Sequence, residues 1–445
     1  MTPHRIVVLG AGFAGLAAAK RAARRLRGTA ARVTLVNAAE HFVERTRLHQ
    51  VAAGQRLPEI RIADLLHGSG VEAVFGRVTA IDPDACTVHV EGHEGPDPAA
   101  PSGEPPMPGR EPLTRLHYDT LVYALGSSWD TRGVPGVAEH AFAVADAEQA
   151  ARLRDHLGAR LGARPGGRGD RLHAQAALPR SAAAPVLAGA DPAASRTVDT
   201  APAPAAASRT RHRIVVAGGG LTGLEAAAEL AEAHPAARVE LVSAEAVADW
   251  LAPRALRHLR GSLRRLGVTV REHTEITAVQ DGRALVGESD PIAFDTLVWT
   301  AGFRVHPLAA EAGLAVDSTG RMLVDPSLRS VSHPEVIAAG DAAAAQTRGG
   351  VSRMTCQTGL PMGLHAGGVA ADAARRRAPR PVRLCYVALN ISLGRRDAVT
   401  QFLRADDTPV RATLVGRSSA ALKEGITRGV VAVLRHPGPY LPGRA

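Results

Sequence analysis

The sequence predicts an α/β protein in which two units of one plan, each with a parallel sheet, accompany a smaller α+β domain. Three observations support this prediction. The motif G-x-G-x-x-G occurs at residues 10–15 and again at 218–223, each time between an apolar run and a segment of small helix-forming residues. The segments YDTLVYALG, at 118–126, and FDTLVWTAG, at 294–302, also resemble each other, with Asp-Thr-Leu-Val followed by a small-residue end. We therefore expect two Rossmann-like units, each binding a dinucleotide.

The chain divides at changes of composition. We expect the first unit to comprise residues 1–157 and, after an interruption, 294–378. The second unit would be 212–293, and the carboxyl-terminal domain 379–445. The stretch 158–211 consists mostly of Ala, Pro, Gly, Ser and Arg, and it cannot bury enough apolar surface to offset the entropy lost on ordering. We expect a disordered linker or insertion there.

Charge and composition narrow the classes of partner. The chain of 445 residues has a net charge of +10, carried almost wholly by arginine, since only Lys20 and Lys423 are lysines. Nucleic acid or an anionic membrane surface could attract such a chain. The aromatic content of 3% does not provide a base-stacking platform. We attribute the charge to a compositional bias toward Arg and Ala, and expect no nucleic-acid partner.

Three cysteines stand far apart in the sequence: Cys86, Cys356 and Cys385. Because no C-x-x-C pair is present, we expect neither a metal site nor a thioredoxin-like pair. The sparse, odd count fits a reducing compartment. The sequence also has no signal-peptide pattern and no run of about 18 apolar residues. The expected location is the cytoplasm.

The glycines of the two motifs have separate physical tasks, and they are Gly10, Gly12 and Gly15 in the first unit and Gly218, Gly220 and Gly223 in the second. In each motif the first glycine allows a tight turn, the second lets backbone approach a pyrophosphate, and the third lets helix and strand pack closely. The pyrophosphate would lie at the helix N-terminus, where free N–H groups and the helix dipole favour negative charge. Neighbouring residues are also expected to contact the cofactors: Ala11, Phe13, Ala14, Leu221 and Thr222.

The residue after the second strand of each unit is expected to face a ribose. In the first unit this residue is Asn37, which can hydrogen-bond a hydroxyl without charge assistance. In the second unit it is Ser243, and Glu245 follows two residues later. Glu245 could accept from the ribose 2′-OH of NADH and repel the 2′-phosphate of NADPH, so NADH is the favoured nucleotide. The alternative is that Glu245 points into solvent.

Further contacts are expected along strands and at their ends, because ligands bind outside the carboxyl ends of parallel strands. These positions are Val78, Ala124, Gly126, Gly302 and Gly340. Asp341 follows directly and could hold a ligand hydroxyl, or only serve a turn. Arg45 lies in a basic segment, 41–54, which could approach cofactor phosphates or form a solvated turn.

Together these residues resemble the flavoproteins of the pyridine nucleotide–disulfide reductase superfamily, and among them the type II NADH dehydrogenases. GAGFAG at 10–15 resembles the FAD fingerprint, and GGGLTGLE at 218–225 resembles the NAD(P)H fingerprint. WTAG at 299–302 and AAGDAAA at 338–344 match later motifs. The resemblance implies FAD and NAD(P)H as cofactors. It also implies that Glu225 lies near nicotinamide and flavin; the alternative is a glutamate that only complements the helix dipole.

The same resemblance implies a quinone as the electron acceptor, with one departure. Type II enzymes carry paired glutamines, A-Q-x-A-x-Q, beside the quinone pocket; here Gln357 matches the first and Pro361 replaces the second. We expect Gln357 and Thr358 to lie at the flavin. The family's amphipathic anchor corresponds to 420–435, which implies peripheral contact with the inner face of the membrane. The alternative is a helix that covers a domain or pairs in a homodimer.

The sequence thus predicts an FAD-dependent NAD(P)H oxidoreductase. NADH would reduce the flavin, which would pass electrons to a quinone or another small acceptor. Bound cofactors would supply the chemistry, which explains why no acid–base triad is visible. Two alternatives stay open: a flavoprotein reductase or oxidase with a soluble acceptor, and a non-catalytic nucleotide-sensing flavoprotein.

Overall fold

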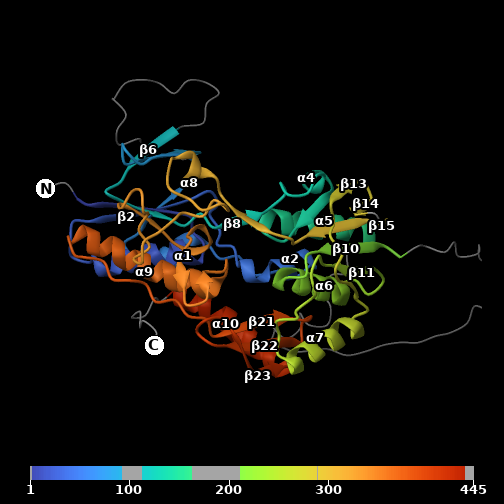
Figure 1. Cartoon of the computed structure of the whole chain (residues 1–445). Helices are drawn as coiled ribbons and strands as arrows, with labels where there is room; N and C mark the ends of the chain where they lie inside the picture. Colours follow the sequence, from blue (N-terminus) through green and yellow to red (C-terminus); the bar gives the residue numbers. More distant parts are fainter. Residues whose placement is uncertain (1–2, 93–112, 163–210, 288, 436–445) are drawn as a thin grey trace, which may run out of the picture.

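The computed structural model describes residues 3–92, 113–162, 211–287 and 289–435. Most of the stretch predicted to be a disordered linker, 158–211, lies outside these residues, but its first residues, 158–161, form the end of a helix, so the prediction is wrong there. Figure 1 shows two α/β units beside one another, with the carboxyl-terminal region below them in this view. Each unit has a five-stranded parallel sheet. The predicted α/β fold class with two Rossmann-like units is confirmed.

The first unit is built on a sheet in the order β18–β7–β1–β2–β3. Its strands are β1 (Arg5–Leu9), β2 (Arg32–Asn37), β3 (Glu72–Phe75), β7 (Thr120–Tyr123) and β18 (Val336–Ala338). Helices α1 (Phe13–Arg25) and α9 (Cys356–Ala374) run side by side along it (Figure 1). A Cβ at Gly363 or Gly367 would overlap the backbone of α1, so these glycines allow the two helices to touch.

The second unit repeats this plan in the order β12–β11–β10–β16–β9. Its strands are β9 (Ala141–Ala143), β10 (Arg213–Ala217), β11 (Arg238–Val242), β12 (Thr269–Arg271) and β16 (Thr296–Trp299). Its helices are α5 (Ala147–Leu161), α6 (Leu221–Ala233) and α7 (Pro253–Arg265). Its inner strands β10, β11 and β16 are mostly apolar and are buried after their first residues, as in other parallel sheets, whereas the edge strand β12 is exposed.

The strand pairing differs from the expected division of the chain at two places. Strand β9 pairs with β16 in the second sheet, although residues 141–157 were expected in the first unit. Helix α5 follows it there and buries Leu153 and Leu157 against the second core. Strand β16 pairs with β10, so the chain re-enters the first unit after residue 299 and not at 294. In both cases sheet pairing, which a composition change does not report, sets the boundary.

Two short strands connect the units where their sheets end. Strands β8 (Ser127–Trp129) and β17 (Phe303–Val305) follow β7 and β16, and they pair with each other in antiparallel fashion. Glycines with positive φ, Gly126 and Gly302, begin the two crossings. Gly302 also accepts a hydrogen bond from the Asp130 amide, 3.2 Å away. The carboxyl edges of the two parallel sheets are thereby tied to one double crossing.

Smaller elements complete the two units. In the first they are η1 (Arg45–Arg47), α2 (Leu48–Ala52), α3 (Ile62–Leu66), β4 (Arg77–Asp82), β5 (Thr87–Glu91), β6 (Leu113–His117), α8 (Leu308–Glu311), η4 (Gly340–Ala342), β19 (Gln346–Thr347) and β20 (Gly350–Val351). In the second they are α4 (Val137–His140), β13 (Ala278–Gln280), β14 (Arg283–Val286) and β15 (Ser289–Ala293). Helix α2 belongs to the first unit by sequence but packs against α5 and α6 of the second.

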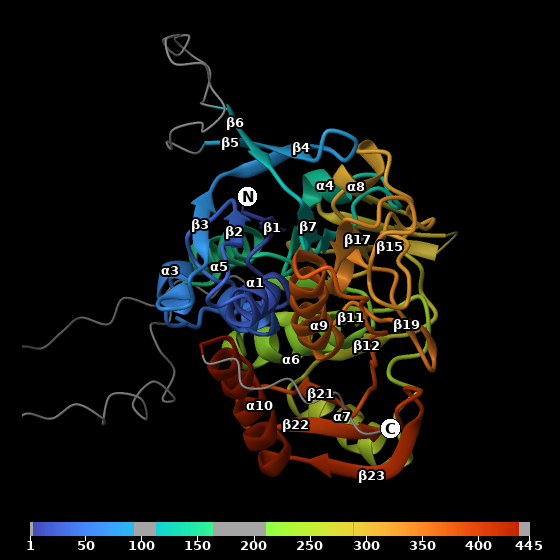
Figure 2. The same ribbon diagram turned by 90° about the vertical axis from the view of Figure 1, so that its left-hand side faces the viewer.

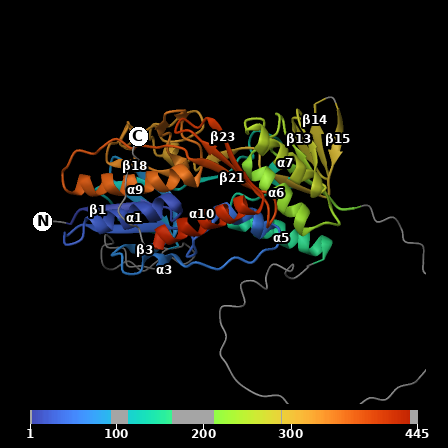
Figure 3. The same cartoon turned by 90° about the horizontal axis from the view of Figure 1, so that it is seen from below.

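The carboxyl-terminal region is an antiparallel sheet followed by one long helix. Its elements are β21 (Ala388–Ser392), β22 (Ala398–Leu403), β23 (Pro409–Val415) and α10 (Arg417–Arg435). The sheet packs against α6 and α7 of the second unit. Figures 2 and 3 show α10 reaching from this sheet to the first unit, where it contacts α1 and α3.

Candidate functional site

The two glycine motifs form the same turn at the carboxyl edge of each sheet. In the first unit the Gly10 amide donates to the Val36 carbonyl at 2.8 Å, and Gly10 has a φ of +93°. In the second the Gly218 amide donates to the Val242 carbonyl at 2.8 Å, with a φ of +115°. These φ values favour glycine over any other residue. The predicted strand–turn–helix geometry is therefore present twice.

The middle glycine of each motif leaves space at the start of a helix. Gly12 and Gly220 are the N-caps of α1 and α6, two helices of 13 residues each. A Cβ built on either glycine would meet no heavy atom within 4 Å. The first-turn N–H groups of each helix lie beside this space, and they favour a negatively charged group. Both turns fit the pyrophosphate of a dinucleotide.

Asn37 and Ser243 occupy equivalent positions at the end of the second strand of each unit, and each contacts the glycine turn of its unit. The Asn37 Oδ1 accepts from the Ala11 amide at 2.9 Å, while its Nδ2 donates to the Ala39 carbonyl at 2.6 Å. Ser243 is 6% exposed and packs under Gly219, where a Cβ would overlap its hydroxyl. The Ser243 Oγ accepts from the Glu245 amide at 3.3 Å. Each side chain therefore has a partner within the protein, and Glu245 is the exposed group beside Ser243.

Arg45 and Asp341 converge at the carboxyl edge of the first sheet. Arg45 Nη1 donates to the Ser127 carbonyl at 2.7 Å and lies 3.9 Å from Asp341 Oδ2. The Ser127 hydroxyl donates to the same Asp341 oxygen at 2.7 Å. Gly126 is in contact with this group, since its Cβ would lie 3.4 Å from Arg45 Nη1. Sequence reasoning found Arg45, Gly126 and Asp341 but missed Ser127, a serine at the first crossing.

Other predicted contacts of the first unit occupy two different places. Gly340 and Ala124 lie beside the turn: a Cβ on Gly340 would be 3.1 Å from that of Ala14, and the Ala124 carbonyl would be 2.5 Å from a Cβ on Gly10. Val78 lies in β4, opposite Val90, and its side chain is buried in the first core. Its side chain therefore does not join the group around Arg45 and Asp341.

The N-terminus of α9 is fastened to the carboxyl-terminal sheet. The Gln357 Nε2 donates to the Ala388 carbonyl at 2.8 Å, and its Oε1 accepts from the Val387 amide at 2.7 Å. Thr358 is 1% exposed and donates to the Arg353 carbonyl at 3.0 Å. Both side chains make contacts inside the protein. Pro361 lies within α9.

Glu225 lies where the two units and the carboxyl-terminal region meet. Its Oε1 accepts from the Lys423 ammonium of α10 and, at 2.9 Å, from the Ser392 amide of β21. The Lys423 Nζ also donates to the Ser392 hydroxyl at 2.7 Å. The second carboxylate oxygen of Glu225, Oε2, is 3.7 Å from His49 Nδ1 of α2. Burial alone would raise the pKa of Glu225, but the charge of Lys423 and the hydrogen bonds from Lys423 and the Ser392 amide hold it below its usual value.

Helix α10 is held by charged groups at its C-terminus and near the middle of its inner face. Lys20 of α1 is 5% exposed and donates to the carbonyls of Leu434 and Arg435, both at 2.7 Å, and to that of Leu65. Arg47 of η1 donates to Glu424 at 2.8 Å. Both lysines of the chain thus hold this helix, Lys20 at its C-terminus and Lys423 from within. The sequence offered one signal for them, their rarity among arginines.

The outer face of α10 is partly apolar. Leu422, Ile426 and Val433 are 37%, 43% and 37% exposed, whereas Leu434 is buried against the first unit. The predicted amphipathic pattern therefore splits between an inner and an outer face. Among the residues that the structure describes, no helix is long and apolar enough to span a bilayer.

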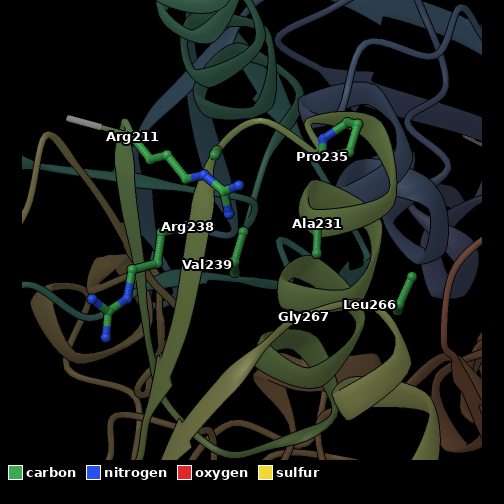
Figure 4. A pocket seen from close by; sticks show the side chains of 8 residues that line it. Arg211, Ala231, Pro235, Arg238, Val239, Leu266 and Gly267 are labelled. Carbon is green, nitrogen blue, oxygen red and sulfur yellow. The ribbon is translucent and has the colours of Figure 1, made fainter. Parts of the chain in front are cut away.

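A small pocket opens at the opposite edge of the second sheet (Figure 4). Its lining comes from the chain before β10, the start of β11 and the ends of α6 and α7, and includes Arg211, Arg238 and Pro235. This is the amino-terminal edge of the strands, whereas Gly218 and Gly220 lie at the carboxyl edge. The pocket is therefore separate from the dinucleotide-like turns.

Comparisons with known proteins agree with this geometry. Residues 4–363 match the family described as pyridine nucleotide-disulphide oxidoreductase. An NADH dehydrogenase-like protein of Mycobacterium tuberculosis is 31% identical over 384 residues, covering 82% of this chain and 79% of that protein. The type II NADH:quinone oxidoreductase of Staphylococcus epidermidis is 27% identical over 366 residues, covering 76% and 74%. The sulfide:quinone oxidoreductase from Aquifex aeolicus shares the fold, with a TM-score of 0.70, 15% identity and coverage of 97% and 91%.

Proposed function

The chain belongs to the pyridine nucleotide-disulphide oxidoreductase family, and from that premise we propose that it is an FAD-dependent oxidoreductase that takes hydride from NADH and passes electrons to a quinone. The family membership confirms the resemblance predicted from the motifs and makes the protein an oxidoreductase. The finer assignments, namely the residues of the site, the nucleotide and the acceptor, are proposals.

One observation carries the proposal: two dinucleotide-type turns at the carboxyl edges of two parallel sheets that share a double crossing. The first turn would hold FAD, with Gly12 facing the pyrophosphate and Asp341 and Arg45 beside the rest of the molecule. The second turn would hold NADH at Gly220. The open space at both middle glycines fits these groups, because any larger side chain would fill it. When bound, a flavin accepts hydride from a nicotinamide and releases electrons to a second substrate.

Glu225 is the proposed residue at the meeting of the two cofactors. It is held on Oε1 by Lys423 and Ser392, so its carboxylate has a fixed orientation and stays ionised. A buried carboxylate with a lysine partner can orient a ring amide or hold a proton near the reacting atoms. Lys423 belongs to the same proposal, because it brings α10 to this point from beyond the region matched by the family.

The acceptor is proposed from the relatives and has one competing reading. Two of the similar proteins are named as quinone oxidoreductases. The departure is Pro361, which stands where the second glutamine of the type II pattern would be, and Gln357, whose amide is bound to β21. This departure favours, as the second candidate, a reductase or oxidase with a soluble acceptor.

Contact with a membrane is proposed through the outer face of α10. Leu422, Ile426 and Val433 present apolar surface on one side of the helix, and Arg428 and Arg435 are exposed elsewhere on the same helix. A basic amphipathic helix of this kind suits the inner face of an anionic membrane, where a quinone would be available. A homodimer formed through the same face is the competing occupant.

The test uses the purified full-length protein. We expect a yellow protein whose flavin absorbance bleaches when NADH is added without oxygen, and returns when a soluble quinone is added. Bleaching without reoxidation by quinone, but with reoxidation by oxygen or a small redox protein, would support the soluble-acceptor alternative. A protein that binds NADH without loss of its flavin absorbance would be a nucleotide sensor. A protein that stays colourless after titration with FAD would contradict the proposal.

A further inference from the structure

His49 is a buried histidine whose second nitrogen has no partner. It lies in α2, in the interface with α6, and is 4% exposed. Its Nε2 is buried without a hydrogen-bond partner among the residues that the structure describes. Buried polar atoms nearly always have partners, so a nitrogen left open in a tightly packed place calls for a reason. The proposed function does not yet use this side chain.

The other nitrogen of His49 faces the carboxylate of Glu225. The distance from His49 Nδ1 to Glu225 Oε2 is 3.7 Å. The opposite oxygen, Oε1, already has two donors, Lys423 and the Ser392 amide. The carboxylate is thus approached from two sides, by α10 and β21 on one oxygen and by α2 on the other. His49 is the group nearest to Oε2 in this arrangement.

The charge around His49 keeps its ring neutral. The pKa of His49 is lowered to about 4, chiefly by burial and also by the positive charges of Lys423 and Arg47, against the opposing effect of Glu225. These three are the charged groups that face the ring, from α6, α10 and η1. At neutral pH the imidazole therefore carries one hydrogen, and a carboxylate beside Nδ1 favours the tautomer with that hydrogen on Nδ1. In that tautomer Nε2 is an acceptor, and it is the nitrogen that has no partner.

We propose that His49 is a positioning residue for Glu225, a neutral imidazole whose Nδ1–H faces the Oε2 edge of the carboxylate from 3.7 Å, longer than a hydrogen bond, and closes on it when the cofactors are bound. This inference rests on the proposed function, in which Glu225 lies at the meeting of the two cofactors. His49 acts through Glu225. It fixes the direction of the carboxylate and favours its ionised form, while Lys423 holds the other oxygen. Leaving Nε2 without a partner lowers the stability of the fold, and this loss is the cost of keeping an imidazole at this position.

A merely structural histidine and a positioning histidine predict opposite results for His49→Leu. Leucine has a similar volume and leaves no unsatisfied nitrogen, so the variant should keep its FAD and melt at the wild-type temperature or above it. Loss of the donor should raise the pKa of Glu225. In stopped-flow reduction of the flavin by NADH across about pH 5 to 9, the acid limb should move up by about 0.5 to 1 pH unit.

Two further variants assign the effect to one nitrogen. The amide nitrogen of His49→Asn can replace Nδ1, so its pH profile should stay close to that of the wild type. His49→Gln moves the amide to the Nε2 position and should behave like His49→Leu, which also covers the case that the leucine variant does not accumulate. The matched control is His41→Leu, a half-exposed histidine of the same segment, which should leave the profile unchanged.

Glu225→Gln separates the two levels of the argument. If it leaves flavin reduction unchanged, the proposed role of Glu225 fails, and the inference on His49 fails with it. If it alters the reduction while His49→Leu and His49→Gln keep the wild-type pH profile, only the inference on His49 is overturned. A fall in melting temperature with an unchanged profile would likewise make His49 a packing residue.

Discussion

The two dinucleotide-type units of this chain share a scaffold down to single contacts. At the amino-terminal edge, or foot, of the first sheet, His4 Nε2 lies 3.0 Å from Thr120 Oγ1. At the foot of the second sheet, His212 Nε2 lies 2.8 Å from Thr296 Oγ1. The first glycine amide of both motifs makes the same 2.8 Å bond to the end of the second strand. Backbone geometry of this kind depends on glycines and strand ends, which is why the motif is visible in sequence.

What differs is the helix that follows each turn. Two positions after the last glycine, α1 has Ala17 where α6 has Glu225; five positions after it, α1 has Lys20 where α6 has Ala228. Helix α1 buries its small face against α9, and Lys20 holds the end of α10. Helix α6 turns Glu225 toward three other elements. The scaffold thus fixes where a dinucleotide can bind, while the neighbours of each helix decide which unit carries the acid.

The most severe test of the comparison is one change made in both units. A Cβ at Gly15 would overlap the Gly10 carbonyl, and a Cβ at Gly223 would overlap the Gly218 carbonyl. Forcing strand and helix apart should cost more than about 3 kcal/mol in either unit. Gly15→Ala should abolish FAD binding, and Gly223→Ala should abolish NADH binding while the protein stays yellow. Absorbance and NADH titration measure both. Gly158→Ala in α5, where a Cβ meets open space, is the control and should leave both cofactors bound, with a small gain in stability from the better helix former.

A milder change tests the cofactor assignment without moving the backbone. Gly220→Glu places a negative side chain in the open space at the start of α6, where the pyrophosphate is proposed to lie. NADH should bind about 100-fold more weakly, since bulk and like charge add, while FAD stays bound. Gly12→Glu should do the reverse and release FAD. Gly220→Gln separates bulk from charge. Loss of both cofactors from Gly220→Glu would mean that the second unit had unfolded.

How far the sequence could predict this molecule follows from the same contrast. The fold class, the glycine turns, Arg45 and Asp341 depend on local patterns, and the sequence indicated them. Ser127 and Lys423 reach their places through long-range packing, by a crossing and by a distant helix, so no spacing reveals them. The place of β9 was missed for the same reason, because strand order is decided by pairing. Gln357 could be identified as a candidate from the sequence, but its contact with strand β21 could not.

Lys20 has no counterpart in the second unit, so removing it should loosen the contacts of α1 with α3 and α10. Lys20→Met would leave its three carbonyl partners without this donor, and those of Leu65 and Leu434 are buried. The free energy of unfolding should fall by about 3 kcal/mol, as for the loss of buried hydrogen bonds to a charged group. Chemical denaturation measures this loss. Arg27→Met, an exposed position after α1, should change little, and equal losses in both variants would contradict the role of Lys20.

Acid should weaken the contacts at the foot of the second sheet more than those at the foot of the first. Burial lowers the pKa of His4, which contacts Thr120, whereas at the foot of the second sheet it lowers the pKa of both His156 and His212, which share the Thr296 hydroxyl. A lowered folded-state pKa means that the unfolded chain takes up protons first as pH falls below 6.5. Stability is full above that pH and declines below it. In His156→Gln the fall in Tm between about pH 7.5 and 5.5 should shrink by about 2 °C; His4→Gln should shrink it less.

The smallest expected effect concerns the ribose position, where the units diverge in charge. Neither Asn37 nor Ser243 has a carboxylate. Asn37 is bound to its own turn, and Ser243 is buried beneath Gly219. Glu272 is engaged by the Val247 amide at 2.7 Å, which leaves Glu245 as the exposed acid beside the turn. A hydrogen bond to a charged group contributes about 1.5 to 3 kcal/mol, so NADH should be preferred over NADPH by about tenfold or somewhat more in kcat/KM.

Glu245→Gln should reduce that preference mainly by improving NADPH, because the amide no longer repels a 2′-phosphate but can still accept from a 2′-OH. Stopped-flow reduction of the flavin by each nucleotide gives the ratio directly. Asp249→Asn is the matched control, an exposed acid on the same loop with the same change of charge. If both variants alter the ratio equally, the effect is a general field of the surface. If the ratio in Glu245→Gln equals that of the wild type, Glu245 points away from the ribose and the nucleotide is chosen elsewhere.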